Sequence, residues 1–217
     1  VAAPGGRFTD YNVRVNGTEK ALFGEVTWRF APTLKLAAGG RYFDTKVENQ
    51  SRQTGLLNLL STGGQLVSAP APVTQQADGF NPKVSLTFEP NEDLLVYGLV
   101  SKGFRFGGPN AIPTNPAFPS PADFGSDKLV NYELGLRASS PDKRFLLDAT
   151  VYYIDWKDIQ LLIVRGDNLA YADNVGRARN IGADVAVTWR PSRAITLNST
   201  LGYLAAELRD NVLAAGV

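Results

Sequence analysis

The 217-residue chain contains no cysteine, no histidine and no methionine. Their absence removes thiol nucleophiles, imidazole acid–base groups, soft metal ligands and disulfide bonds together. We therefore expect a protein that is not an enzyme, with no catalytic residue, no metal site and no bound cofactor.

Long apolar runs and a charge bias are also missing. No stretch approaches the roughly 18 uninterrupted apolar residues that a membrane-spanning helix needs. The 22 basic and 21 acidic residues give a net charge of +1 and form no basic stripe, so nucleic acid is not an expected partner. The chain opens without the pattern of a signal peptide, and its abrupt ends lead us to expect a fragment.

Apolar and polar residues alternate along eight stretches, and this period of two predicts β-strands. In the first stretch Val26 and Trp28 share one face, while Glu25 and Arg29 share the other. The predicted strands are residues 20–30, 34–47, 80–89, 94–104, 129–139, 144–156, 179–190 and 195–208. The sequence therefore predicts an all-β fold whose strands each have one apolar face.

The lengths of the connections distinguish between all-β folds. Four connections are short turns rich in Pro, Asp and Ser, at residues 31–33, 90–93, 140–143 and 191–194. The three connections between them are long, at about 48–79, 105–128 and 157–178. This strict alternation is typical of an antiparallel transmembrane β-barrel with short periplasmic turns and long extracellular loops. A soluble β-sandwich fits the residue alternation but gives no reason for the alternating connections.

The two faces of the predicted strands suit lipid and lumen. Aromatic residues on the apolar face gather near the strand ends, as they do at the two interfaces of a membrane. We predict a membrane girdle of Trp28, Phe30, Tyr42, Phe88, Tyr132, Phe145, Tyr153, Trp189 and Tyr203. We predict that the other face lines the lumen through Glu25, Arg29, Arg41, Lys83, Glu133, Arg137, Asp148 and Asp184. Such a face also suits a small barrel of eight strands filled by its own side chains, so it does not set the strand number.

A resemblance to a known family rests on three segments of the chain. They are FNPKVSLTFEPNEDLLVYGLVSKGFRFGGPN at 80–110, NYELGLRASSPDKRFLLDATVYYIDWKDIQ at 131–160 and NVGRARNIGADVAVTWRPSRAITLNSTLGY at 174–203. In order and spacing they resemble the barrel of TonB-dependent outer-membrane receptors. The resemblance implies a bacterial outer-membrane barrel of about 22 strands around an N-terminal plug. Residues 1–217 would then be part of a single barrel domain, with about eight strands present and the plug and remaining strands absent.

The resemblance also implies a function. It points to TonB-dependent active import of a scarce nutrient, most often a ferric siderophore. The implied partners are the TonB complex, through an N-terminal segment not present here, membrane lipid and lipopolysaccharide, and a small-molecule nutrient or metal chelate.

Specificity would lie in the long loops, and we predict ligand binding by Phe104, Arg105, Phe106 and Asn110 at the mouth of the second loop. Arg105 would pair with an anionic chelate, and the two rings would stack on a flat ligand. The alternative is that these four residues only fix the strand end and the rim.

The first long connection contains four closely spaced leucines, Leu56, Leu57, Leu59 and Leu60. They predict a short helix folded over the barrel mouth, or a direct contact with a partner protein or ligand. Three other functions stay open at this point: a passive porin, an autotransporter or adhesin barrel, and a soluble β-sandwich binding module. A plug domain upstream would distinguish an importer from a porin.

Overall fold

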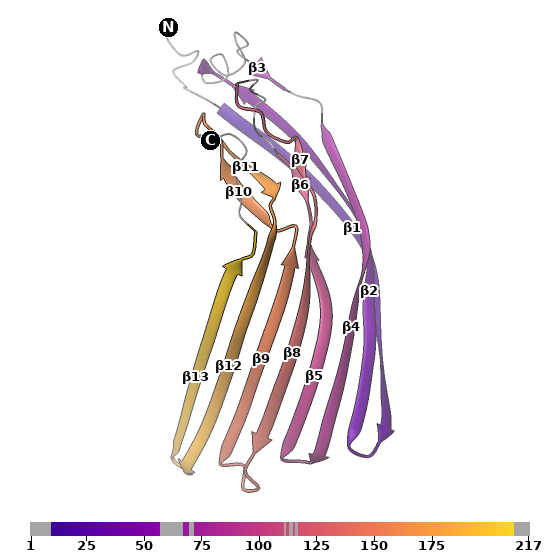
Figure 1. Cartoon of the computed structure of the whole chain (residues 1–217), viewed down its shortest axis with the longest axis vertical. Helices are drawn as coiled ribbons and strands as arrows, with labels where there is room; N and C mark the ends of the chain where they lie inside the picture. Colours follow the sequence, from indigo (N-terminus) through magenta and orange to yellow (C-terminus); the bar gives the residue numbers. More distant parts are fainter. Residues whose placement is uncertain are drawn as a thin grey trace.

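The computed structural model describes residues 10–56, 67–69, 72–110, 112, 115 and 117–210. These residues form a tall curved sheet, with the short turns at its lower end in Figure 1 and the long connections at its upper end. In this part of the chain no helix has the length and apolar character needed to cross a membrane.

Eight long antiparallel strands make up the sheet, and they pair in the order in which they follow one another along the chain. They are β1 (Asp10–Ala31), β2 (Leu34–Thr54), β4 (Val73–Asn91), β5 (Leu94–Arg105), β8 (Asp127–Ser139), β9 (Phe145–Lys157), β12 (Arg177–Ser192) and β13 (Ile195–Leu208). The predicted strands, and the alternation of short with long connections, are confirmed. Among the described residues β1 and β13 each pair on one side only, so the sheet has two open edges and barrel closure is not seen.

The first three strands are longer than predicted. The sequence predicts a loop over residues 48–79, but β2 continues to Thr54 and β4 begins at Val73. A further short strand, β3 (Val67–Ser68), pairs with the end of β2. The extensions of β2 and β4 are mostly polar, so the apolar alternation ends in these two strands while the backbone pairing continues. Of the predicted leucine helix, Leu57, Leu59 and Leu60 lie outside the described residues.

The sheet divides above the middle of β5. Hydrogen-bonded pairing between β4 and β5 ends at Lys83 and Ser101. Beyond this point β4 stays paired with β2, and β5 stays paired with β8 as far as Arg105. Figure 1 shows β1, β2 and β4 continuing past the ends of the other long strands. We call the opening beyond Lys83 and Ser101 the β4–β5 seam.

Three phenylalanines fill the β4–β5 seam. The rings of Phe43 and Phe104 stack with centroids 3.8 Å apart. The ring of Phe106 meets both edge-on, at 4.7 Å from Phe104 and 6.0 Å from Phe43. A Cβ atom at Gly79 would lie 2.8 Å from the Phe43 ring, so a glycine is required beneath it. Apolar burial thus replaces the missing ladder of hydrogen bonds.

We call the sheet of eight long strands the wall, and the face that carries Leu22 and Trp28 its outer face. This outer face changes from apolar to polar along a line. Leu22, Tyr42 and Phe80 lie side by side in the register of β1, β2 and β4, and all three are exposed. The next outward-facing row consists of Lys20, Asp44 and Asp78. A boundary this sharp is expected where a strand leaves the hydrocarbon layer of a membrane.

Candidate functional site at the long-loop end

Register places the predicted lumen residues and the predicted girdle aromatics on opposite faces of the sheet. The eight predicted lumen residues share one face of the sheet. The nine predicted girdle aromatics occupy the opposite face and are all exposed, from Tyr153 at 40% to Tyr203 at 65%. Rings also pair along this face, with centroids 5.5 Å apart for Trp28 and Phe30 and 6.2 Å apart for Tyr132 and Tyr153. Their contact with lipid, and the water-facing role of the charged side, stay predictions.

The predicted lumen face is held by polar contacts between strands. Arg137 and Asp148 lie directly opposite each other, with 2.7 Å between Nε and Oδ2. Lys83 reaches across β2 to within 3.5 Å of Glu25. Gly39 lies between these two residues, and a Cβ there would come within 3.0 Å of the Glu25 Cβ.

Four further predicted lumen residues have different surroundings. Arg41 pairs with Glu19. The Tyr97 hydroxyl donates to a Glu133 carboxylate oxygen at 2.5 Å. Arg29 donates to the carbonyl of Pro32 in the short turn at 3.1 Å. Asp184 is exposed and lies opposite Thr150 of β9.

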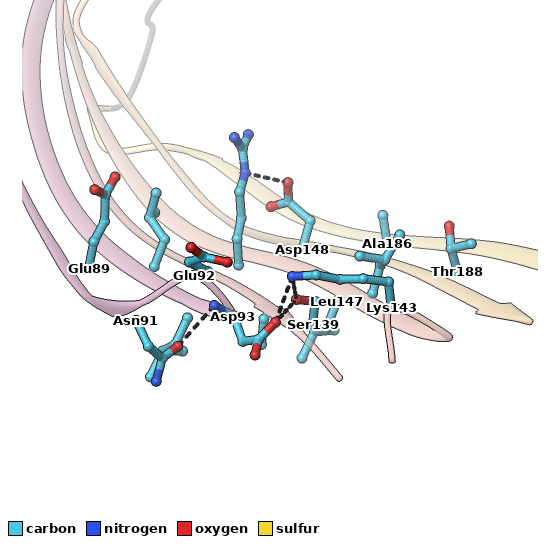
Figure 2. Close-up of a pocket in the computed structure, with 15 residues that line it drawn as sticks. Glu89, Asn91, Glu92, Asp93, Ser139, Lys143, Leu147, Asp148, Ala186 and Thr188 are labelled. Carbon is cyan, nitrogen blue, oxygen red and sulfur yellow. Dashed lines mark hydrogen bonds and ion pairs between the residues drawn. The ribbon is translucent and has the colours of Figure 1, made fainter. Parts of the chain in front are cut away.

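A hollow of about 700 Å³ opens at the short-turn end of the wall (Figure 2). There Lys143, in the turn before β9, donates to the Asp93 carboxylate at 2.6 Å and to the Ser139 hydroxyl at 3.0 Å. Hydrogen bonding from Lys143 is the main cause that holds the pKa of Asp93 below its usual value. Figure 2 shows Lys143 reaching toward Asp93 and Ser139, so these groups join two neighbouring turns. These groups have a structural role at the short-turn end of the sheet.

Two small hairpins stand at the long-loop end. One is formed by β6 (Gly108–Pro109) and β7 (Asp123–Phe124), and the other by β10 (Gln160–Val164) and β11 (Ala170–Asn174). We call these hairpins and the strand ends beneath them the rim.

Predicted ligand residue Arg105 forms an ion pair with the fully buried carboxylate of Asp127. The Asp127 oxygens accept from the Arg105 backbone N–H at 3.0 Å and from its Nε at 2.7 Å. The guanidinium lies 4.6 Å above the centre of the Trp156 ring and donates to the carbonyl of Gln160 at 3.3 Å. This cluster joins β5, β8, β9 and β10. The sequence does not predict Asp127 as the partner of Arg105, because an acidic residue at the start of a strand is its only distinguishing feature.

Predicted ligand residue Asn110 connects the two hairpins. Its side-chain amide donates to the Ala172 carbonyl at 2.8 Å and accepts from the Ala172 N–H at 2.8 Å. The same amide donates to the Pro121 carbonyl at 3.1 Å. The Asn110 side chain thus takes the place of a neighbouring strand beside β11. It satisfies the backbone N–H and carbonyl of Ala172.

Three other side-chain amides act in the same way. Gln75 donates to the Phe124 carbonyl at 2.7 Å. Gln160 donates to the carbonyls of Phe106 and Gly125 at 2.8 and 2.9 Å. Asn174 donates to the Gly125 carbonyl at 3.0 Å and accepts from its N–H at 2.5 Å. No pattern in the sequence predicts these contacts. We call Gln75, Asn110, Gln160 and Asn174 the rim amides.

The tip of the β10–β11 hairpin is held by a buried ion pair. Arg165, only 5% exposed, donates through Nε and Nη2 to the two Asp167 oxygens at 2.9 and 2.7 Å. Its Nη1 donates to the Ser120 hydroxyl at 3.0 Å, and Asn115 donates to Asp167 at 3.3 Å. The hydrogen bonds from Arg165 are the main cause that lowers the pKa of Asp167. These contacts dock the hairpin tip on the connection between β6 and β7.

The rim presents a few accessible groups to a ligand. Phe106 is 37% exposed, and the Arg105 side chain retains 46% exposure despite its ion pair. Leu162 and Val164 share one face of β10 and are 77% and 69% exposed, although sequence reasoning did not single them out. No cluster of three or more His, Cys, Asp or Glu side chains suited to a metal ion occurs in the described part of the chain.

Comparison with known families is decisive. The family model described as "TonB dependent receptor-like, beta-barrel" matches residues 1–216. The chain belongs to this family. The resemblance expected from the sequence is therefore confirmed, and this receptor-barrel segment belongs in the bacterial outer membrane.

Individual relatives agree with the family. The chain is 27% identical over 172 residues to the pesticin receptor of Yersinia pestis, covering 78% of this chain and 23% of that protein. It resembles the crystal structure of the ferric yersiniabactin uptake receptor FyuA from Yersinia pestis, with a TM-score of 0.75, 21% identity, and coverage of 93% of this chain and 28% of that one.

A second solved structure has the same fold. The ferric-catecholate import receptor Fiu from Escherichia coli K12 matches with a TM-score of 0.69 and 16% identity, covering 91% of this chain and 29% of that one. The receptor-barrel segment thus spans about a quarter of the length of the proteins it matches.

Proposed function

We propose that this chain forms part of the wall and extracellular rim of a receptor that imports a ferric siderophore across the outer membrane, with energy supplied through TonB. The family match over residues 1–216 carries this proposal. It is supported by matched proteins whose names refer to ferric yersiniabactin uptake and ferric-catecholate import. The TonB complex, membrane lipid and lipopolysaccharide are proposed partners of the whole protein.

Residues 1–217 are part of a single barrel domain in this proposal, and the complete barrel has about 22 strands around a plug. The two open edges, β1 and β13, support a larger barrel. Unpaired backbone groups cost several kcal/mol each in hydrocarbon, so an intact receptor must pair both edges with further strands.

At the rim, cargo recognition is assigned to the accessible groups. A siderophore supplies the iron ligands itself, so the protein needs aromatic, apolar and cationic contacts rather than metal-binding side chains. Arg105 and Phe106 offer a cation and a ring, and Leu162 and Val164 add an apolar surface. Phe104 and Asn110 act by holding this surface in place.

The transport proposal is tested with the full-length receptor in a bacterium that lacks its own siderophore receptors. Uptake of radioactive iron is measured with ferric phenolate, catecholate and hydroxamate chelates, in strains with and without TonB. We expect uptake of one chelate class, lost without TonB. Uptake that persists without TonB identifies a passive porin and overturns the proposal.

The assignment of the rim is tested by binding of the transported chelate to purified receptor. Phe106→Ala and Leu162→Ala are each expected to weaken binding about tenfold, the effect of one well-placed apolar contact. Leu134→Ala, on the outer face of β8, is the matched control. If all three variants bind the chelate as tightly as the wild type does, Phe106 and Leu162 are not part of the binding site.

A further inference from the structure

Three lysines gather on the outer face of the wall, directly above the aromatic pair Tyr132 and Tyr153. Lys128 of β8 and Lys157 of β9 are direct cross-strand partners, and all three lysines are exposed. Lys102 of β5 lies on the same face, one step away, opposite Val130. Like charges placed opposite each other destabilise a sheet, so a bound anion would stabilise this arrangement of lysines.

A hollow of about 580 Å³ at the β4–β5 seam is lined by all three lysines, together with Phe43 and Phe104. Asp78 and Asp155 also line it and offset part of the positive charge. Asp155 lies 3.9 Å from Lys157. Neither Lys102 nor Lys128 has an ion-pair partner among the residues that the structure describes. The hollow therefore has two uncommitted cations.

An apolar hollow of about 630 Å³ lies immediately below on the same face. Its lining includes Val100, Tyr132, Tyr153 and Tyr203. Gly98 and Ala183 also line it, and their small size leaves the space between the larger residues unfilled. The charged and apolar hollows are adjoining, because Val130 of the upper one is two residues, or about 7 Å, from Tyr132 of the lower one. A cationic site thus continues into an apolar one at the level where the wall leaves the membrane.

We propose that the two hollows together bind one phosphorylated lipid of the outer leaflet, the lipid A part of lipopolysaccharide. Lys102, Lys128 and Lys157 hold a phosphate, and an acyl chain lies against Gly98 and Ala183. A phosphate offers several acceptor oxygens to converging ammonium groups, which lysines bind as point charges. The inference rests on the outer-membrane location of the family and not on the identity of the cargo, so either can fail alone.

The charged hollow is tested with full-length, delipidated receptor titrated with bis-phosphorylated lipid A in detergent. Each basic residue beside an anionic lipid contributes about a factor of five, so K102Q/K128Q/K157Q is expected to bind about a hundredfold more weakly. The matched control is R14Q/K20Q/K46Q, which removes three exposed cations from the outer face of β1 and β2. The control is expected to bind as the wild type does.

The apolar hollow is tested separately with Gly98→Leu. A Cβ at Gly98 meets nothing within 4 Å, so the substitution fills the hollow without straining the strand. It is expected to weaken lipid A binding at least tenfold, with an unchanged thermal midpoint and unchanged chelate uptake. This variant decides the matter if the triple lysine variant does not fold.

Several results overturn the proposal. If folded K102Q/K128Q/K157Q or Gly98→Leu binds lipid A with wild-type affinity, the proposed site does not exist. If R14Q/K20Q/K46Q loses as much affinity as the triple lysine variant, binding reflects only general charge attraction. Dephosphorylated lipid A is expected to bind as weakly as lipid A binds the triple variant. Inorganic phosphate at millimolar concentration is expected not to compete, and full competition would mean that the lysines bind the free ion instead.

Discussion

The wall and the rim of this receptor segment are held together by different means. Below the β4–β5 seam the wall is a continuous ladder of backbone hydrogen bonds between sequence neighbours, and ion pairs such as that of Arg137 with Asp148 are exposed. The rim has short hairpins joined by buried ion pairs and side-chain amides, with Asp127 fully buried. Removal of one side chain should therefore lower the local stability only slightly in the wall and much more in the rim.

The largest expected effect is that of Asp127→Ala. Removing this carboxylate leaves the Arg105 N–H and guanidinium without their acceptor. Because Arg105 is partly exposed, we expect a loss of about 2–3 kcal/mol in the local stability of the rim, below the cost of a wholly buried pair. Hydrogen exchange of residues 105–127 and 157–177 in the full receptor measures it. Exchange within β9 and β12 serves as the internal control, and equal loosening there would contradict the division between rim and wall.

Asn110→Ala should have a smaller effect of the same kind. It removes the amide that pairs with Ala172 and so uncouples the two hairpins, at a cost of about 1–2 kcal/mol. Proteolysis of the hairpins in folded receptor is expected to speed up accordingly. Asn16→Ala, at an exposed position of β1, is the matched control and should change nothing.

Acid should loosen the tip of the β10–β11 hairpin before it affects the wall. The hydrogen bonds from Arg165 lower the pKa of Asp167 from its ordinary value of 3.8, so the carboxylate stabilises the folded tip. That stability is fully present above the ordinary value and is lost as the pH falls through the lowered one. Hydrogen exchange of residues 165–169, corrected for intrinsic rates, should rise only below about pH 4. In Asp167→Asn this pH dependence should disappear.

Arg137→Gln should have the smallest effect. The Arg137 and Asp148 side chains are 64% and 44% exposed, and exposed ion pairs contribute less than about 1 kcal/mol. The thermal midpoint of the full receptor should therefore stay within error of the wild-type value. A shift as large as that of Asp127→Ala would show that the wall also depends on single side chains.

The wall could be predicted from the sequence because its signal is local. Residues such as Val26 and Trp28 alternate with Glu25 and Arg29, so face and register follow from a period of two. The prediction ended too early in β2, where Lys46 and Gln50 face outward beyond the apolar band and hydrophobicity no longer marks the strand.

The rim could be predicted only in part. The sequence predicts a role for Arg105 and Asn110 at the mouth of the second loop, but it does not predict their partners. Asn110 contacts Ala172 across 62 residues, and Gln75 contacts Phe124 across 49. An amide that satisfies distant backbone groups leaves no periodic trace, so only the folded arrangement shows it.

The rim amides also bear on how such receptors diverge. Because these side chains and the Asp127 carboxylate hold the loops from within, the outward-facing Leu162 and Val164 have little part in holding the fold. Substitutions there can accumulate one at a time without unfolding the rim. Under the proposed function, substitutions at a few exposed positions would therefore change which nutrient is bound without disturbing the frame that presents them.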